Sequence, residues 1–373
     1  MPLAEGVLEL ARWAPSGDNS QPWRFRIASE SEIDVYGYDT RDHCVYDLDG
    51  WSSQLAHGML LETVAIAASA HGAHAHFALP DEGPEQPDAS GGNARPLRYG
   101  VRLEPDPSLQ PDPLAGFIVE RSVQRRPMVP RSLTRGERDS IERAARPLRV
   151  AWFDSLRART RIAALCMKNA RIRMTIPEAY SVHRSVIAWR AHSSEDRLPD
   201  RSLGADPVLL AMMRYAMASW QRLERVNRWM GTLLPRLELD FLPGVLCSAH
   251  IAIVTERETT SVADRVAAGR AIQRVWLTAT SLGMQMQPEH TPLVFARYAR
   301  TRRTFTRSPA ALNEAAAIAM GLEAALPGVG DGHVAWLSRI GPARRLSGRS
   351  LRLPLDRLIV GEPPAKLPPL APA

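Results

Sequence analysis

The chain has 373 residues, of which 45% are apolar and 23% are charged, a composition that can bury a core and excludes a disordered or fibrous protein. Its length allows one large domain or two of ordinary size. The net charge is +7, but arginine supplies nearly all of the basic residues, with lysine only at Lys168 and Lys366. This favours a general arginine bias over a polyanionic partner.

The three cysteines, Cys44, Cys166 and Cys247, are odd in number and widely separated. They predict neither a disulfide framework nor a Cys-x-x-Cys zinc site, and they fit a reducing compartment. The chain enters a helix without a basic segment and a long apolar run, and no window reaches the roughly 18 apolar residues that a membrane span needs. We therefore expect a cytoplasmic protein with no membrane partner.

The first predicted element is a helix that ends near Trp13, because Pro15 disfavours helical backbone in the residue before it. Ser16 to Ser20 is a polar turn of small residues, and Trp23 to Ile27 alternates apolar and polar residues as a half-buried strand does. Periodicity alone favours an ordinary helix-to-strand turn, in which Asn19 bonds its own backbone.

A second strand is predicted over Ile33 to Tyr38, followed by a long buried helix over Ser52 to Ser69. Two breaks come next: a loop rich in Gly, Asp and Ser from Pro80 to Pro96, and a proline-rich loop from Pro105 to Pro113. We expect the first loop to be flexible, and a new half of the protein to begin after Gly116.

Thr134 and Glu137 have the spacing of a capping box, which predicts a helix running to about Ala145. A short strand is expected over Val150 to Phe153. Two long helical regions then lie at about 156–190 and 207–234. The second region carries Met and Trp residues at positions that favour core packing, with a lid over a pocket as the alternative: Met212, Met213, Met217, Trp220 and Trp229.

Ser248 to Val254 alternates as a strand, and Ala263 to Leu282 is strongly helical and closed by Gly283, which suits a left-handed helix terminus. The segments 339–341 and 349–359 complete the folded part. The tail from Glu362 contains five prolines, and we expect it to be disordered.

The order of residues in the first turn, Ala-Pro-Ser-x-x-Asn-x-Gln-Pro-Trp-x-Phe from Ala14 to Phe25, resembles the early motif of the nitroreductase family of FMN-dependent oxidoreductases. The resemblance implies that Ser16 and Asn19 contact the isoalloxazine of the flavin. It also implies that Gln21 and Trp23 fix the turn and pack beneath it.

Three later segments resemble the same family. Arg121-Ser122-Val123-Gln124-Arg125 is similar to the Arg-Arg-Ser-x-Arg motif that grips the FMN phosphate and ring edge, although Gln124 stands where the family often has its second basic residue. A basic surface linker is the alternative for this segment. Residues 269–284 look like the family's late helix and glycine turn, after which Gln285 to Glu289 would line the flavin. Arg349 to Leu355 is similar to the basic segment that completes the phosphate site. The implied cofactor-binding residues are Ser16, Asn19, Arg121, Ser122, Arg125, Gln285, Arg349 and Arg352.

Typical family members are homodimers in which the turn and the arginine motif of one site come from different subunits. Here the turn stands near residue 15, the arginine motif follows a half-chain later, and no second Pro-Ser-x-x-Asn motif follows Arg121. We infer a fused pseudo-dimer with one flavin site, resembling the Acg and MoeY-like branch. The expected fold is α+β and nitroreductase-like, with mostly antiparallel central sheets flanked by helices. The expected halves are 1–115 and 116–360, with a helical insertion at about 155–240 and a disordered tail at 361–373.

The resemblance implies an FMN-dependent oxidoreductase that passes electrons in a ping-pong cycle from NAD(P)H to a small organic acceptor, as a monomeric pseudo-dimer or a homodimer. The alternative is a flavin-sequestering protein with little turnover, and a specialised biosynthetic dehydrogenation stays open. No catalytic side chain is identified. We expect no metal, because no His-x-x-x-His pair has a nearby carboxylate, and no nucleic acid, since the arginines at 300–307 suit a solvated loop.

Overall fold

The first half of the chain forms a helix, two strands, a long helix and two more strands in the computed structural model, which describes residues 1–80, 96–329, 332–345 and 347–367. These elements are α1 (Leu3–Ala11), β1 (Trp23–Ile27), β2 (Glu32–Gly37), α2 (Trp51–Ala70), β3 (Ala73–Ala78) and β4 (Leu97–Pro105). The strands pair antiparallel in the order β1-β2-β4-β3. The loop expected between Pro80 and Pro96 falls on 81–95, outside the described residues.

The second half repeats this series of elements with two helical segments inserted. Its core elements are α3 (Arg135–Ala145), β5 (Arg149–Phe153), β9 (Ala249–Thr255), α10 (Val262–Ser281), β10 (Met284–Pro288) and β11 (His333–Pro342). The antiparallel order β5-β9-β11-β10 is the order of the first sheet with each strand replaced by its counterpart. The α+β class and the two tandem halves are confirmed. The boundaries at residues 115 and 360 remain predictions.

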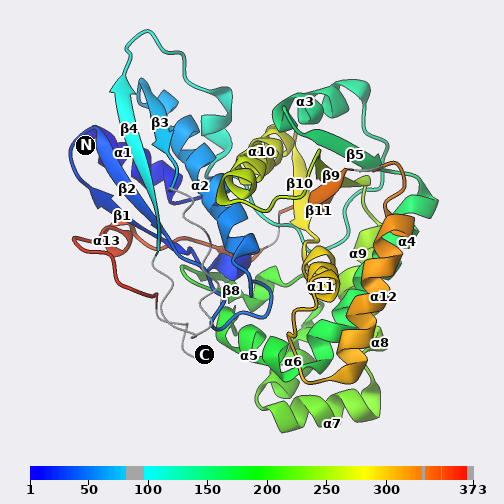
Figure 1. Cartoon of the computed structure of the whole chain (residues 1–373). Coiled ribbons are helices and arrows are strands. Elements are labelled where there is room, and N and C mark those ends of the chain that lie inside the picture. Colours follow the sequence, from blue (N-terminus) through cyan, green and yellow to red (C-terminus); the bar gives the residue numbers. More distant parts are fainter. Residues whose placement is uncertain (81–95, 330–331, 346, 368–373) are drawn as a thin grey trace.

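The remaining elements lie between or after these repeats (Figure 1). Between β5 and β9 the structure has α4 (Leu156–Thr175), α5 (Pro177–Val186), β6 (Ile187–Ala188), β7 (Ser193–Ser194), β8 (Leu198–Pro199), α6 (Pro207–Met217), α7 (Trp220–Met230), α8 (Leu233–Arg236), the π-helical turn Leu237–Phe241 and α9 (Leu242–Val245). Between β10 and β11 stand α11 (Thr291–Arg300) and α12 (Pro309–Ala325), and β12 (Arg349–Ser350) and α13 (Leu355–Leu358) follow β11. Short 3₁₀ turns occur at Gly17–Asn19, Pro113–Phe117 and Asp200–Ser202.

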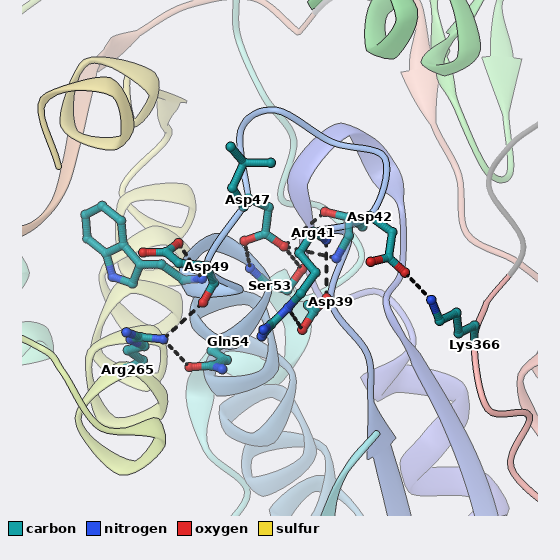
Figure 2. Close-up of polar contacts among 12 residues, drawn as sticks. Asp39, Arg41, Asp42, Asp47, Asp49, Ser53, Gln54, Arg265 and Lys366 are labelled. Atoms are coloured by element: carbon teal, nitrogen blue, oxygen red, sulfur yellow. Dashed lines mark hydrogen bonds and ion pairs between the residues drawn. The ribbon is translucent and has the colours of Figure 1, made fainter. Parts of the chain in front are cut away.

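The two halves meet where α2 crosses α10, side by side at the centre of the molecule (Figure 1). Two glycines permit this approach: a Cβ on Gly58 would lie 2.2 Å from the carbonyl oxygen of Val266, and one on Gly269 would lie 2.1 Å from that of Leu55. Buried polar bonds join the same helices, with Arg265 Nη1 donating to Gln54 Oε1 at 2.8 Å (Figure 2). The packing of α2 against α10 therefore depends on direct backbone contact, which a side chain at Gly58 or Gly269 would prevent.

The two long helical regions of the insertion are each divided. The residue before Pro177, Ile176, has extended backbone with φ −108° and ψ 140°, so α4 ends there and α5 begins at the proline. Ser219 is likewise extended, and its hydroxyl caps α7 by accepting from the backbone N–H of Arg222. The spacing of apolar residues predicted one continuous helical region across each break, because a single extended residue does not change that spacing.

The predicted capping box of α3 is confirmed: Thr134 Oγ1 accepts from the N–H of Glu137 at 3.2 Å, and the Glu137 carboxylate accepts from the N–H of Thr134 at 2.7 Å. We expect Thr134→Ala to lower the free energy of unfolding by about 1 kcal/mol, because it removes the acceptor for a helix-terminal N–H. Urea denaturation measures this effect. An unchanged midpoint would show that α3 does not depend on the cap.

The end of the chain contacts the first half. Val360, which precedes the expected tail, donates its N–H to the Phe25 carbonyl of β1 at 2.8 Å, and within the tail the Pro364 carbonyl accepts from the Tyr38 hydroxyl at 2.8 Å. The disorder expected for 361–373 stays a prediction. Figure 2 shows Lys366 pointing toward Asp42, with which it forms an ion pair of 2.6 Å. The end of the second half is thus tied to the sheet of the first. Residues 368–373 lie outside the described part of the chain.

Candidate functional site

A cavity of about 730 Å³ is lined by residues of both halves and of the insertion. Seven of the eight predicted cofactor-binding residues line it: Ser16, Asn19, Arg121, Ser122, Arg125, Arg349 and Arg352. Gln285 does not, although it is buried on β10 and accepts a hydrogen bond of 3.1 Å from the hydroxyl of Ser122. The residues that follow it, Gln287 to Glu289, do line the cavity. The fold therefore brings together motifs that lie more than 300 residues apart in the chain.

Three cavity arginines form a cluster, which we call the arginine cluster: Arg121, Arg349 and Arg352. Arg121 is 5% exposed, its guanidinium lies 4.6 Å from the centre of the Trp276 ring, and its Nε has no hydrogen-bond partner. Arg349 lies over Trp13 at 5.0 Å. Arg352 donates from Nε to the Ala14 carbonyl at 2.9 Å. The cluster is thus held by aromatic rings and backbone carbonyls.

The arginine cluster carries uncompensated positive charge. Within the described residues no carboxylate forms an ion pair with any of the three, and nearby Glu120 pairs with Arg345 at 2.8 Å. Burial, with repulsion from Arg349, lowers the pKa of Arg121 to about 9. Burial also lowers the pKa of Arg352 well below its usual range, with further lowering by its arginine neighbours. Like charges gathered in a buried pocket are what an anion-binding site requires.

The turn of residues 16–21 is a rigid corner of the same cavity. Asp18, Asn19 and Gln21 have φ of 50°, 62° and 45°, a left-handed conformation that Asp and Asn adopt more readily than most residues. The Ser16 hydroxyl accepts from the Gln21 N–H at 2.9 Å. The Gln21 side chain donates to the Glu195 carbonyl at 2.8 Å and accepts from the Leu353 N–H at 2.9 Å. Gln21 therefore ties the turn to the insertion and to the C-terminal segment.

The amide of Asn19 is already used within the protein. Its Nδ2 donates to the carbonyls of Glu195, Arg197 and Leu351 at 3.1, 3.3 and 3.2 Å. Its Oδ1 is buried without a partner. The amide donors of Asn19 are therefore engaged within the protein, and its side-chain oxygen is enclosed by protein atoms without a hydrogen-bond partner.

Arg125 lies in the same cavity but apart from the arginine cluster. Its Nη1 donates to the Ser202 carbonyl of the insertion at 3.0 Å. Burial lowers its pKa to about 10, against the opposing attraction of Asp18. Gln124 does not line the cavity: its side chain donates to the Arg344 carbonyl, and its N–H donates to the Met286 carbonyl at 3.1 Å.

A second charged group, which no sequence motif indicated, joins His250 on β9 and Arg339 on β11 to Glu289, the residue that follows β10. His250 Nδ1 lies 2.6 Å from Glu289 Oε2, and Arg339 Nη1 lies 3.1 Å from Glu289 Oε1. All three side chains are buried, and Glu289 and Arg339 line the cavity. Burial lowers the pKa of His250, but Glu289 and Cys247 together, through charge and hydrogen bonds, outweigh burial and raise the pKa to about 10.

This pair makes the stability depend on pH. The folded protein keeps the His250 proton that the unfolded chain releases near pH 6.5, so the stabilisation is complete below that pH and fades toward pH 10. We expect the free energy of unfolding to fall between about pH 7 and 9, by up to about 1.4 kcal/mol per pH unit from this group, and the slope to flatten in His250→Gln. Denaturation at several pH values tests this, and an equal slope in the variant would contradict it.

The insertion forms the apolar wall of the cavity. Its lining side chains include Leu209, Met212, Met213, Met217, Leu223, Met230 and Leu234. Met217 is buried, but Trp229 is 84% exposed, so core packing is the wrong interpretation for that tryptophan. Helices α6 to α8 therefore cover the cavity. Within the described residues, no helix has the length and apolar character to cross a membrane, and no group of three or more His, Cys, Asp or Glu side chains could hold a metal ion.

Comparison with protein-family models finds no match. Among curated proteins, the chain is similar to the uncharacterized protein MT1398 of Mycobacterium tuberculosis (strain CDC 1551 / Oshkosh), with 26% identity over 300 residues. The matched region covers 79% of this chain and 40% of that protein, so the chain spans less than half of its relative's length.

Solved structures similar to this chain include three flavoproteins. A nitroreductase with bound FMN from Desulfitobacterium hafniense DCB-2 has 15% identity and a TM-score of 0.37, over 68% of this chain and 99% of that one. The FMN-dependent nitroreductase NfnB of Mycobacterium smegmatis, in complex with NADPH, has 15% identity and a TM-score of 0.35, over 65% and 94%. A BluB-like flavoprotein from Clostridium difficile 630 has 12% identity and a TM-score of 0.37, over 68% and 100%. Likeness at this level does not transfer a function.

Proposed function

We propose that this protein is an FMN-dependent oxidoreductase of the nitroreductase type, built as a fused pseudo-dimer with one flavin site. The observation that carries the proposal is the arginine cluster at one cavity, in which Arg121 and Arg352 are buried, Arg349 is half-buried, and no member forms an ion pair with a carboxylate among the described residues. The sequence motifs point to the same residues. The resemblance to the Acg and MoeY-like branch belongs to this proposal.

The residues present fit FMN. Its phosphate suits the arginine cluster, where the unpartnered Nε of Arg121 offers a buried donor. A cavity of about 730 Å³ lies within the usual range for cofactor sites. Ser16, Asn19, Ser122 and Arg125 are the proposed neighbours of the ring, and Gln285 orients Ser122 through its hydrogen bond.

When bound, FMN would supply the two-electron chemistry that links a nicotinamide donor to a small organic acceptor. The chain's own residues would hold the phosphate, fix the position of the ring and exclude water with the methionine wall of the insertion. NAD(P)H is the proposed donor, and it would bind transiently next to the flavin. We assign no catalytic side chain, and the proposed assembly is a monomer or a homodimer.

A titration with two flavins tests the phosphate site. Riboflavin has the ring of FMN without the phosphate, so the apoprotein should bind it at least roughly 100-fold more weakly than FMN, because several charge-assisted hydrogen bonds are lost. Quenching of flavin fluorescence measures both affinities. Equal affinities would show that the arginine cluster does not hold the phosphate.

A flavin-sequestering protein is the second candidate, favoured by the contacts between the insertion and the turn. The carbonyls of Glu195 and Arg197 accept hydrogen bonds from Asn19 and Gln21, so the insertion closes directly onto the proposed ring site. This candidate predicts a bound flavin that NADH and NADPH do not reduce. Rapid reduction followed by turnover with bulky acceptors would contradict it.

A further inference from the structure

The outer face of the insertion exposes large apolar and aromatic side chains. We call it the insertion face, and its exposed members are Val208, Tyr215, Trp229, Met230, Leu233 and Leu234. Trp229 is 84% exposed and Leu234 is 62% exposed. Neither α7 nor α8 contains a buried residue. Figure 1 shows α7 at the bottom of the molecule, at the end opposite β4 and α3. A grouped apolar surface of this kind marks an interaction site.

The insertion face is also basic. Arg214, Arg222, Arg225 and Arg228 are exposed on α6 and α7, and no ion pair within the described residues engages any of them. Glu224 is the acidic residue of α7. Other arginines, such as Arg270 and Arg274, pair with a carboxylate, in their case that of Glu62 at 2.7 and 2.8 Å. Exposed arginines and exposed apolar side chains therefore occur together on the same two helices, α6 and α7.

The cavity wall reaches the same face. Met230 and Leu234 line the cavity, and both are more than half exposed. Gly231, which lies between them, lines it too. The rim of the candidate site is therefore formed by the residues next to Trp229.

We propose that the insertion face docks on an anionic lipid bilayer, with α7 and α8 in the headgroup region and the rim of the cavity against the lipid. The arginines, which form no ion pair with a carboxylate within the described residues, match the negative headgroups, while Trp229, Leu233 and Leu234 would leave water for the acyl boundary. A nucleic acid would match the arginines but leave the aliphatic side chains in water. This proposal departs from the sequence-based expectation of no membrane partner, which rested on the absence of an apolar span; a surface contact needs no spanning helix.

Sedimentation with lipid vesicles tests the proposal on the purified full chain. Vesicles of phosphatidylcholine with about 30 mol% phosphatidylserine should bind it, and vesicles of phosphatidylcholine alone should not. Binding should weaken as the salt rises from about 0.1 to 0.5 M, because salt screens the headgroup charge. Lipids brominated near the headgroup should quench tryptophan emission more strongly in the wild type than in Trp229→Gln, which keeps Trp220 on α7.

Matched variants separate docking at this face from diffuse attraction. Arg222→Gln with Arg225→Gln should weaken vesicle binding by roughly 25-fold, at about fivefold per arginine. The control, Arg102→Gln with Arg143→Gln, removes two exposed arginines that form no ion pair within the described residues from β4 and α3 at the other end of the molecule, and should change binding little.

Three results would overturn the proposal. The first is no binding to the anionic vesicles at low salt, and the second is an equal loss of binding in both double variants. The third is a chain that does not bind vesicles but forms a dimer, which Trp229→Gln dissociates. All substituted side chains are exposed, so unchanged denaturation midpoints are expected. The binding assay does not depend on the flavin, so its outcome is separate from that of the proposed function.

Discussion

Arg121→Ala is expected to weaken FMN binding by roughly 1.5–3 kcal/mol, or about 10- to 150-fold in Kd, because a charge-assisted hydrogen bond to the phosphate is lost. The same substitution should leave the stability of the apoprotein unchanged or raise it. Arg121 has like-charged neighbours and forms no ion pair with a carboxylate among the described residues. Its replacement by alanine therefore reduces the repulsion among the arginines and leaves no buried carboxylate without a partner. Flavin titration and urea denaturation of the same sample measure the two effects.

Arg98→Ala is the matched control, since Arg98 is 62% exposed and pairs with Asp34 on the sheet of the first half. It should leave FMN affinity unchanged. If Arg121→Ala also leaves the affinity unchanged, the phosphate is held elsewhere, and Arg125, Arg349 and Arg352 are the next residues to replace. A large loss of apoprotein stability would show that Arg121 is a structural residue.

The second large effect is expected at the crossing of α2 and α10. Gly58→Ala or Gly269→Ala would place a Cβ within 2.2 Å of a backbone carbonyl oxygen in the facing helix, so the helices must separate. We expect each substitution to lower the free energy of unfolding by at least about 2 kcal/mol, although alanine is the better helix former by about 1 kcal/mol. Chemical denaturation measures the loss.

Gly136→Ala is the matched control, because Gly136 lies in α3 and a Cβ there would meet no atom within 4 Å. It should stabilise the protein by roughly 0.5–1 kcal/mol through helix propensity. If the two interior substitutions behaved like this control, the close approach of α2 and α10 would be wrong, and the two halves would join differently.

Elements with a local signal were predictable from sequence. β1 runs over Trp23–Ile27 as its alternation indicated, and α10 ends one residue before Leu282, with Gly283 at φ 72°. The prediction of each element used the periodicity of its side chains and the residue that ends it, and these signals come from residues within a few positions of one another. β3 was not foreseen, because its alternating residues are mostly alanine and histidine, which give a weak strand pattern.

The site was partly predictable for a similar reason. The turn at Ser16 to Asn19 and the arginines at 121, 349 and 352 carry a recognisable order of residues, and the fold brings them to one cavity. His250, Glu289 and Arg339 form no recognisable sequence motif. Glu289 is 39 residues from His250 and 50 residues from Arg339 in the chain, and the three lie on different elements. Their proximity follows from strand pairing across the second sheet, which apolar periodicity does not specify.

The central claim is tested most directly by the absorbance spectrum of the purified protein, followed by anaerobic addition of NADH and then NADPH. The account predicts flavin bands near about 370 and 450 nm that bleach with one of the two donors. A protein that holds no flavin, even after reconstitution with FMN, would contradict the account. Bands that persist under both donors would contradict the nicotinamide-dependent reaction and favour sequestration.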